Sequence, residues 1–210
     1  MGVKSKNQHF MRFTIALVLL FWCAIGYSQN GATIISDNEE FRHELNAEYA
    51  DSAKSPLTKE DFNSFTGLPF FEIDTNYHVV AEFERAKKSK SFKMKTTTDR
   101  RPVYEIYGTV TFTLSGKDVK LNVYQSHRLR EMEQYKNDLF LPFTDLSNGA
   151  ESYGGGRFID LEIPEGTTIE IDFNQAYNPY CAYSTRYSCP IPPKGNFIDL
   201  SVLAGVKNPH

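Results

Sequence analysis

Apolar residues near the N-terminus recur at every fourth position, which is the spacing of one face of a helix. Phe41, Leu45 and Tyr49 form this apolar stripe. Ser36 and Glu39 have the spacing of a capping box, in which each side chain binds a backbone N–H group of the other residue. The pattern therefore predicts a helix of about four turns that begins just after Ser36.

Two further segments complete the helical part of the chain. Residues 29–35 are expected to form a short flexible lead-in before the first helix. Pro56 interrupts the helical pattern, and Thr58 with Asp61 predicts the start of a second, shorter helix. We therefore expect helices within residues 37–66.

After Pro69 the apolar period changes to two residues, which is typical of strands with one buried face. About eight strands joined mostly by short turns favour an antiparallel sandwich or closed barrel over a parallel sheet. The predicted fold class is therefore mainly β, with an N-terminal helical segment and a β-rich part over residues 70–207. The alternating residues are Tyr77, Val79, Ala81 and Phe83; Phe92 and Met94; Tyr104, Ile106, Val110, Phe112 and Leu114; Val119, Leu121 and Val123; Ile159, Leu161 and Ile163; Ile169, Ile171 and Phe173; and a last strand within 197–203.

Three features refine this picture. Gly108 lies inside the longest alternating run, where a glycine commonly marks a bend or bulge in a curled sheet. The strand at 157–163 turns at 164–166 and is expected to pair with the strand at 169–173 as a hairpin. The charged stretch 127–138 fits a surface helix or a long loop, and the sequence leaves both open.

The first 28 residues have a composition that the rest of the chain lacks. A basic start is followed by an apolar run at 13–25, in which Thr14 is the one polar residue. This run is too short for the ~20 residues of a helix that crosses a bilayer, and Gly26 and Ser28 then supply the small residues of a cleavage site. We predict a signal peptide over residues 1–28, cleaved after Ser28. An uncleaved membrane anchor is the alternative.

Export would place the mature chain in the periplasm or outside the cell, without stable insertion in a membrane. Cleavage removes three of the 23 Lys and Arg residues and none of the 26 Asp and Glu residues. This leaves 20 basic against 26 acidic side chains, a net charge of −6. The acidic balance argues against nucleic acid as a partner, and it leaves the oligomeric state open.

Cys181 and Cys189 are the two cysteines of the mature chain. In an oxidising compartment, two cysteines this close in sequence most simply form a disulfide. A metal site is the alternative, but no CxxC motif or neighbouring histidine completes a ligand set. We therefore expect a Cys181–Cys189 disulfide, no metal and no cofactor.

A glycine-rich stretch at 153–156 leads into the strand that begins with Arg157. The glycines lack the Lys-Ser/Thr ending of a phosphate loop. Arg157 has the parity of Ile159 on the inward face, where an unpaired charge is too costly to bury. One interpretation is a salt bridge from Arg157 to Asp145 or Glu151 that closes the core. The other is an anion-binding arginine at the entrance of a pocket.

A tyrosine-rich segment follows the last predicted hairpin, at 174–187. Tyrosine rings present flat amphipathic faces that suit sugars and other ligands, although they also serve as lids over a barrel end. In an antiparallel hairpin the start of one strand lies beside the end of the other, so Arg157 and Asn174 would meet at one end of the sheet. The candidate ligand-binding residues are Arg157, Asn174, Tyr177, Tyr180, Tyr183 and Asp145.

Basic residues are concentrated between residues 85 and 101. Lysines that point outward on a hairpin guard a strand edge against pairing with other chains. We take a solvated edge as the default interpretation, with an anionic partner such as a polysaccharide as the alternative.

Several motifs occur in a fixed order along the mature chain. They are Gly67-Leu68-Pro69-Phe70-Phe71, Leu141-Pro142-Phe143-Thr144-Asp145, Tyr153-Gly154-Gly155-Gly156-Arg157-Phe158-Ile159-Asp160-Leu161, Asp172-Phe173-Asn174 and Asn178-Pro179-Tyr180-Cys181-Ala182-Tyr183. With this set the chain resembles, from about Phe41 to Lys207, the prokaryotic domain-of-unknown-function family numbered 1684. The resemblance implies a single domain, which we place at 36–207, and no established activity. Relatives without a signal peptide keep the paired cysteines, so a redox or metal role for them stays open.

Three functional hypotheses are compatible with these features. The preferred one is a secreted or periplasmic binding module for a small polar or anionic ligand. The first alternative is a hydrolase that uses Asp145, Glu151 or Asp160 near the glycine-rich stretch. The second is a structural interaction domain without a small ligand. The chain contains no HExxH or GxSxG motif, so we assign no catalytic residue.

Overall fold

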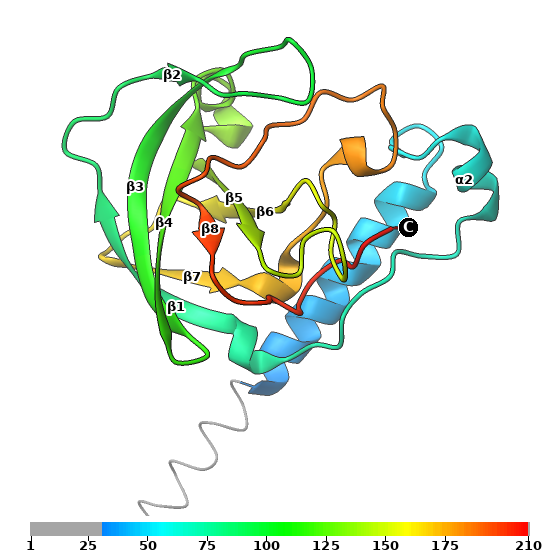
Figure 1. The fold of residues 1–210 in the computed structure, drawn as a ribbon, viewed down its shortest axis with the longest axis horizontal. Helices are drawn as coiled ribbons and strands as arrows, with labels where there is room; N and C mark the ends of the chain where they lie inside the picture. The colour runs from blue at the N-terminus through cyan, green and yellow to red at the C-terminus, as the bar shows by residue number, and fades with distance from the viewer. Residues whose placement is uncertain (1–30, 210) are drawn as a thin grey trace, which may run out of the picture.

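The computed structural model describes residues 31–209, so the predicted signal peptide and the first residues of the lead-in lie outside the described residues. Within this part, eight strands form one sheet that curves into a half-barrel, with a helix over residues 31–50 beside it (Figure 1). The strands are β1 (His78–Arg85), β2 (Phe92–Lys93), β3 (Val103–Leu114), β4 (Lys117–Ser126), β5 (Asp138–Asp145), β6 (Arg157–Glu162), β7 (Thr168–Asp172) and β8 (Phe197–Ile198).

The strands follow the order β6-β5-β4-β3-β1-β7 across the sheet, with β2 beside β3 and β8 beside β5. The pairings in the described part are antiparallel except that of β5 with β8. The mainly β, antiparallel class that the sequence predicts is confirmed. The sheet is a half-barrel with β6 and β7 at its two edges, in place of the sandwich or closed barrel we expected.

The predicted hairpin between residues 157–163 and 169–173 is wrong. The two segments form β6 and β7, which lie at opposite ends of the sheet order. β6 pairs with β5, whereas β7 pairs with β1. Alternation identifies a strand but does not determine which neighbour it pairs with. The turn at 164–166 therefore joins the two edges of the half-barrel.

The alternating pattern did not predict β5. Residues 139–143 are apolar at consecutive positions, and Pro142 lies within them. A continuous apolar run is typical of a strand buried on both faces, and a proline lowers the expectation of a strand. Both faces of β5 are indeed covered. Leu141 lies in the main core, and Phe140 packs against Phe158 on the opposite face, with ring centroids 4.8 Å apart.

A β-bulge lets β3 contribute apolar residues to both faces of the sheet. The register against β4 shifts between Ile106 and Gly108, which confirms the irregularity expected at the glycine. Ile106 lies opposite Tyr124, whereas Gly108 lies opposite Val123, so the apolar alternation changes face at the bulge. Tyr104 and Ile106 consequently pack with Tyr124 in a separate cluster and not in the main core.

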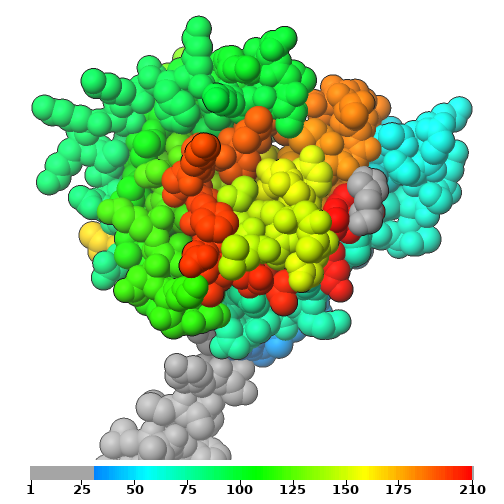
Figure 2. All heavy atoms as spheres, in the orientation of Figure 1, coloured from blue at the N-terminus to red at the C-terminus, as the bar shows by residue number. Residues whose placement is uncertain are grey.

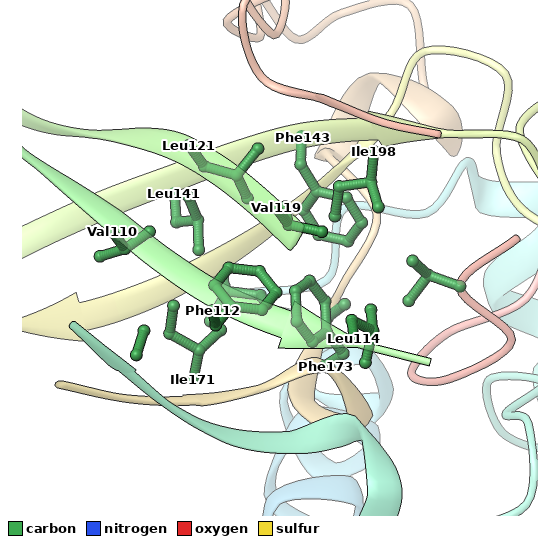
Figure 3. Close-up of a cluster of buried hydrophobic side chains, with 14 of the residues drawn as sticks. Val110, Phe112, Leu114, Val119, Leu121, Leu141, Phe143, Ile171, Phe173 and Ile198 are labelled. Carbon is green, nitrogen blue, oxygen red and sulfur yellow. The ribbon is translucent and has the colours of Figure 1, made fainter. Parts of the chain in front are cut away.

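The main core lies inside the half-barrel (Figure 3). Phe112, Phe143 and Phe173 bring three rings together there, and Phe143 meets Phe173 edge to face with centroids 5.3 Å apart. Ile198 and Val202 add apolar side chains from the C-terminal segment. Each large side chain that is fully buried contributes roughly 1.5–3 kcal/mol. This core therefore contributes to the stability of the half-barrel.

The N-terminal helix begins earlier than the sequence predicts. The expected flexible lead-in is helical from residue 31 onward. Ser36 does not cap the helix, because its hydroxyl donates to a carbonyl oxygen one turn back at 2.9 Å. Asn38 attaches this part of the helix to the sheet. Its side-chain amide donates to the carbonyl of Ile34 at 2.8 Å and to the carboxylate of Asp172 at 2.6 Å, which fastens this turn to β7.

The helix lies beside both edges of the half-barrel. Ile34 and Asp37 line the same hollow as Glu162 of β6 and Glu170 of β7. At the other end of the helix, Tyr49 is buried in a second apolar cluster. The helix thus forms a wall next to the edge strands.

Short elements connect these parts. α2 (Lys59–Ser64) is capped by Thr58, whose hydroxyl accepts a backbone N–H group of the first turn at 3.2 Å. The stretch 127–138, which the sequence left open, contains two 3-10 turns, η2 (Leu129–Glu131) and η3 (Glu133–Tyr135). Over residues 31–209, no helix combines the length and the apolar character needed to cross a bilayer.

Candidate functional site

Arg157 and Asp145 form a closed ion pair inside the main core. The Arg157 Nη2 atom lies 2.9 Å from the Asp145 Oδ2 atom, and both side chains have 0% exposed surface. Arg157 also donates to the carbonyl oxygens of Val202, at 2.7 Å, and Ala204. Of the two interpretations of Arg157, the geometry is that of the salt bridge to Asp145.

The surroundings of this pair supply further hydrogen bonds, to both side chains except the Arg157 Nε atom. Burial lowers the pKa of Arg157, and the charge of Asp145 opposes that shift. The second carboxylate oxygen of Asp145 accepts the N–H groups of Ser147 at 2.8 Å and Val202 at 3.1 Å. The pair therefore ties the C-terminal segment to β5 and β6, and neither side chain has surface that a ligand could contact.

The glycine-rich stretch forms a tight turn next to this pair. Gly156 has a φ of +85°, a left-handed conformation that favours glycine. A Cβ atom at Gly156 would lie 2.6 Å from the carbonyl oxygen of Phe143. The glycine is thus required for backbone shape and for a close approach to β5.

Asn174 connects two structural segments. Its side chain accepts the N–H group of Asp74 at 3.0 Å and donates to the Asp74 carbonyl at 2.9 Å and to Asp172 at 2.8 Å. The start of β6 does meet the segment after β7, but through Phe158 and Tyr177, whose backbones exchange hydrogen bonds of 2.9 and 3.0 Å. The strand that follows the glycine-rich stretch and the tyrosine-rich segment therefore converge at Tyr177 instead of at Asn174.

This convergence builds a cavity of about 710 Å³. It lies between the N-terminal helix and the face of β5 and β6 opposite the main core, and we call it the aromatic cavity. Its volume is typical of small-molecule sites. The rings on its wall include Tyr104, Tyr135, Phe140, Phe158, Tyr177 and Tyr180.

A tyrosine–carboxylate pair lies on the wall of the aromatic cavity. The hydroxyl of Tyr177 donates to the Oδ2 atom of Asp160 at 2.8 Å. Asp160 keeps exposed surface, yet burial raises its pKa, while the Tyr177 hydrogen bond lowers it and the charge of Asp138 raises it. Burial likewise raises the pKa of Tyr177 well above its usual value. On the wall of a cavity, a carboxylate can be accessible and still be poorly solvated, which explains the raised pKa.

Further acids line the aromatic cavity and its edge. The hydroxyl of Tyr180 donates to the carboxylate of Glu48 on the helix. Burial raises the pKa of Asp138, and the charge of Glu162 adds to the shift. Asp138 and Asp160 also line a neighbouring hollow of about 480 Å³, which we call the acidic hollow. Its other acidic residues are Asp37, Glu162, Glu170 and Asp172, and His78 lies among them.

The predicted site residues divide between the cavity and the protein interior. Tyr177 and Tyr180 line the aromatic cavity. Tyr183 instead packs edge to face on Tyr49, with centroids 5.1 Å apart, and its hydroxyl accepts the Asn178 amide at 3.2 Å. Arg157, Asp145 and Asn174 are buried inside the protein and bonded to other protein groups, although the Arg157 Nε atom has no hydrogen-bond partner among the described residues.

Sequence reasoning missed the sheet wall of the cavity. Asp138 and Phe140 belong to β5, the strand that the pattern did not predict. Phe158 and Asp160 alternate with the inward residues of β6, and that alternation was the available signal for a second functional face.

The acids of the hydrolase hypothesis lie in three different environments. Asp145 is buried in the core, and Glu151 is exposed on the glycine-rich turn. Asp160 lies at the aromatic cavity, where its neighbouring carboxylate is Asp138.

Cys181 and Cys189 are free in the structure, so the predicted disulfide is absent. The spacing does bring the two residues together, since the N–H group of Cys181 donates to the Sγ atom of Cys189 at 3.2 Å. The hydrogen bond from the Cys189 thiol lowers the pKa of Cys181 to about 6, and it raises that of Cys189. Sequence spacing fixes their proximity but not their oxidation state. In the described part of the chain, no three His, Cys, Asp or Glu side chains are grouped to hold a metal ion.

The fold and the site define a class of protein: a half-barrel domain whose N-terminal helix and sheet enclose an aromatic cavity with acidic walls. The chain belongs to the family described as "Protein of unknown function (DUF1684)", which matches residues 63–207. The resemblance found in the sequence is thereby confirmed. The chain is also similar to the solution NMR structure of an uncharacterized protein from Haloarcula marismortui, with 32% sequence identity and a TM-score of 0.66. That match covers 85% of this chain and 96% of the other. No curated protein matches the sequence.

Proposed function

We propose that the protein is a binding module for a small polar ligand, which occupies the aromatic cavity. The observation that carries this proposal is the Tyr177–Asp160 pair, because its carboxylate faces accessible space. An ionised carboxylate offers about four acceptor positions, of which Tyr177 uses one. The remaining positions are available to a ligand.

The wall chemistry indicates which ligand groups would bind there. Glu48, Asp138 and Asp160 are acceptors, so they favour ligand hydroxyl or ammonium groups. The rings of the cavity offer flat faces to the apolar side of a sugar or a similar molecule. A purely anionic ligand is unfavourable beside these acids, because like charges repel. Of the two ligand types in the sequence hypothesis, we therefore retain the polar ligand and not the purely anionic one for the aromatic cavity.

Export remains part of the proposal. The basic start and the apolar run motivate cleavage after Ser28, followed by function in the periplasm or outside the cell. The intact mass of protein from the exported fraction should correspond to a chain that begins at Gln29. A full-length protein held in the membrane would contradict this part of the proposal.

A ligand screen by thermal unfolding tests the binding function. The panel comprises neutral mono- and disaccharides, amino alcohols, polyamines and amino acids, with sodium sulfate as a purely anionic probe. A ligand that binds only the folded state raises Tm, and at 100 times its Kd it stabilises the protein by about 2.7 kcal/mol. We expect a shift with ligands that carry hydroxyl or ammonium groups and none with sulfate.

Matched variants locate the binding site. Tyr177→Phe and Asp160→Asn should reduce the ligand-induced shift, because they remove polar groups from the cavity wall. Tyr107→Phe and Asp118→Asn make the same chemical changes at residues that do not line the cavity. If the control pair reduces the shift as much as the cavity pair, or if no ligand class shifts the wild type, the proposal fails.

A further inference from the structure

The aromatic cavity continues into another hollow, of about 560 Å³, which we call the basic hollow. Tyr104, Ser126 and Arg128 line both spaces. The acidic hollow joins the same cavity through Asp138 and Asp160, and it shares no lining residue with the basic hollow. The three spaces therefore adjoin one another in a row, which we call the groove, and its two ends differ chemically.

One end of this groove is positively charged. Arg100, Arg101 and Arg128 line the basic hollow together with His127, and Glu131 is the acid among its described lining residues. This cluster is distinct from the buried Arg157, which has no accessible surface.

Arg128 differs from its neighbours in having its donors unused. His127 and Arg130 each contact Glu105 at 3.1 Å, and Arg100 donates to Ser188. The side chain of Arg128 is exposed, and its guanidinium makes no hydrogen bond or salt bridge with any residue in 31–209. A guanidinium presents donors in a planar fork that matches a carboxylate or a phosphate.

The other end of the groove has the opposite charge and accepts positive groups. Asp138 and Asp160 lie where the aromatic cavity meets the acidic hollow. No salt bridge involves either of them in the described residues, so neither acid is neutralised by a cation of the protein. Opposite charges at two ends of one groove select a ligand with opposite charges at its own two ends.

We infer that the ligand is a small zwitterion with an ammonium group at Asp138 and Asp160 and an oxyanion at Arg128. Apolar or ring atoms of the ligand lie between them, on the aromatic wall. The oxyanion is a carboxylate or a phosphate, since both match the arginine fork. This inference rests on the proposed function, because it names the ligand class for the same cavity.

Titration calorimetry with blocked ligands tests each charge separately. The first probe is the tripeptide Gly-Phe-Gly with both termini free; the others carry an acetylated N-terminus, an amidated C-terminus, or both. We expect each block to weaken binding by at least about tenfold, because a charge-assisted hydrogen bond is lost. The analogue of Gly-Phe-Gly that carries a phosphonate in place of the C-terminal carboxylate changes the oxyanion alone, so its affinity relative to the free tripeptide identifies the preferred oxyanion.

Variants assign each charge to its end of the groove. Arg128→Gln should weaken the free tripeptide but not the amidated one, and Asp160→Asn should weaken the free tripeptide but not the acetylated one. Lys88→Gln is the matched control for loss of a positive charge. Lys88 is exposed on the segment between β1 and β2, which projects from the body of the molecule at the upper left of Figure 2.

The outcomes separate this inference from the proposed function. If neutral sugars or doubly blocked peptides bind as tightly as the free tripeptide and Tyr177→Phe still weakens them, the cavity binds ligands but the zwitterion inference is overturned. Binding that depends on Arg128 but not on Asp160 also overturns it, because it reports a simple oxyanion site. If no probe binds in a Tyr177-dependent way, the proposed function itself fails.

Discussion

β6 carries a charged side chain on each of its two faces, and these side chains differ in burial and in the number of their bonds. On the inner face, Arg157 is fully buried, paired with Asp145 at 2.9 Å and bonded to backbone carbonyls. On the outer face, Asp160 has one hydrogen bond, from Tyr177, and opens into the aromatic cavity. The two residues lie only three positions apart in sequence, yet Arg157 has an ion pair and two carbonyl acceptors, whereas the Asp160 side chain has one hydrogen bond.

This difference separates a structural charge from a functional one. A buried charge is tolerated when ion pairs and hydrogen bonds replace its water, and then it has nothing left to offer a ligand. A charge on a cavity wall is poorly solvated and still incompletely bonded, so a ligand can supply the missing partners. The inner face of β6 therefore holds the fold together, and the outer face is available for binding.

The largest effect should come from the inner face. Arg157→Gln leaves the Asp145 carboxylate buried without its cation, and we expect a loss of about 3–5 kcal/mol in the free energy of unfolding. Urea denaturation of wild type and variant measures this loss. Arg128→Gln is the exposed control and should change stability by less than about 0.5 kcal/mol. A fully stable Arg157→Gln protein that has lost ligand binding would reverse our comparison of the two faces.

A substitution on the outer face of β6 should lower ligand affinity more than it lowers the stability of the fold. Asp160→Asn keeps the shape of the side chain and removes its charge, so ligand affinity should fall about tenfold, which corresponds to about 1.4 kcal/mol. Calorimetric titration gives the affinity, and urea denaturation of the same samples gives the stability. Unchanged affinity together with a large loss of stability would show that Asp160 is structural too.

The stability of Asp160→Asn should depend on pH differently from the stability of wild type. Because the folded-state pKa of Asp160 is raised by burial, the folded protein holds this proton to higher pH than the unfolded chain. The stabilisation of the folded protein that results is complete below the unfolded pKa of about 3.9, and it is lost as the pH rises through the folded pKa. Asp160→Asn lacks that loss, so its stability relative to wild type should increase with pH over this interval. A stability difference that stays constant with pH would contradict the shift.

The smallest energetic effect concerns the cysteine pair beside the aromatic cavity. The pKa of Cys181 is lowered to about 6, so its thiolate predominates above that pH and its alkylation rate should level off near neutrality. In Cys189→Ala the thiol that donates to Cys181 is gone. The alkylation rate of Cys181 should then keep rising with pH up to the ordinary cysteine pKa of about 8.5. Iodoacetamide labelling with mass spectrometry measures both. Purified protein without any free thiol would instead support the disulfide that the spacing predicted.

Local patterns determined much of the fold in advance. Period-two alternation located β3, β6 and β7, and the glycine in β3 marked the bulge at which its apolar residues change face. Strand partners could not be derived in the same way, because β6 pairs with the unpredicted strand β5 and β7 pairs with β1, which is far away in sequence. The uniformly apolar β5, with Pro142 in its middle, lacked the alternation on which strand prediction depends.

The candidate site was harder to predict for a related reason. The sequence correctly set Arg157 on the inward face and offered Asp145 as its partner, because the parity of a strand is a local property. The aromatic cavity needs β5, β6, the tyrosine segment and the N-terminal helix together. Tyr177 and Tyr180 were selected by composition, whereas Asp138 and Arg128 had no local feature that distinguished them from ordinary surface charges.

The most direct test of the account is a map of where a bound ligand contacts the protein. Backbone amide resonances of the ¹⁵N-labelled protein would be followed during titration with the best ligand from the thermal screen. We predict shifts at Asp160, Tyr177 and Tyr180, on the wall of the aromatic cavity, with little change at Val202 and Ala204 beside the buried ion pair. Shifts concentrated at Val202, Ala204 and the glycine-rich turn, with none at Asp160 and Tyr177, would contradict it.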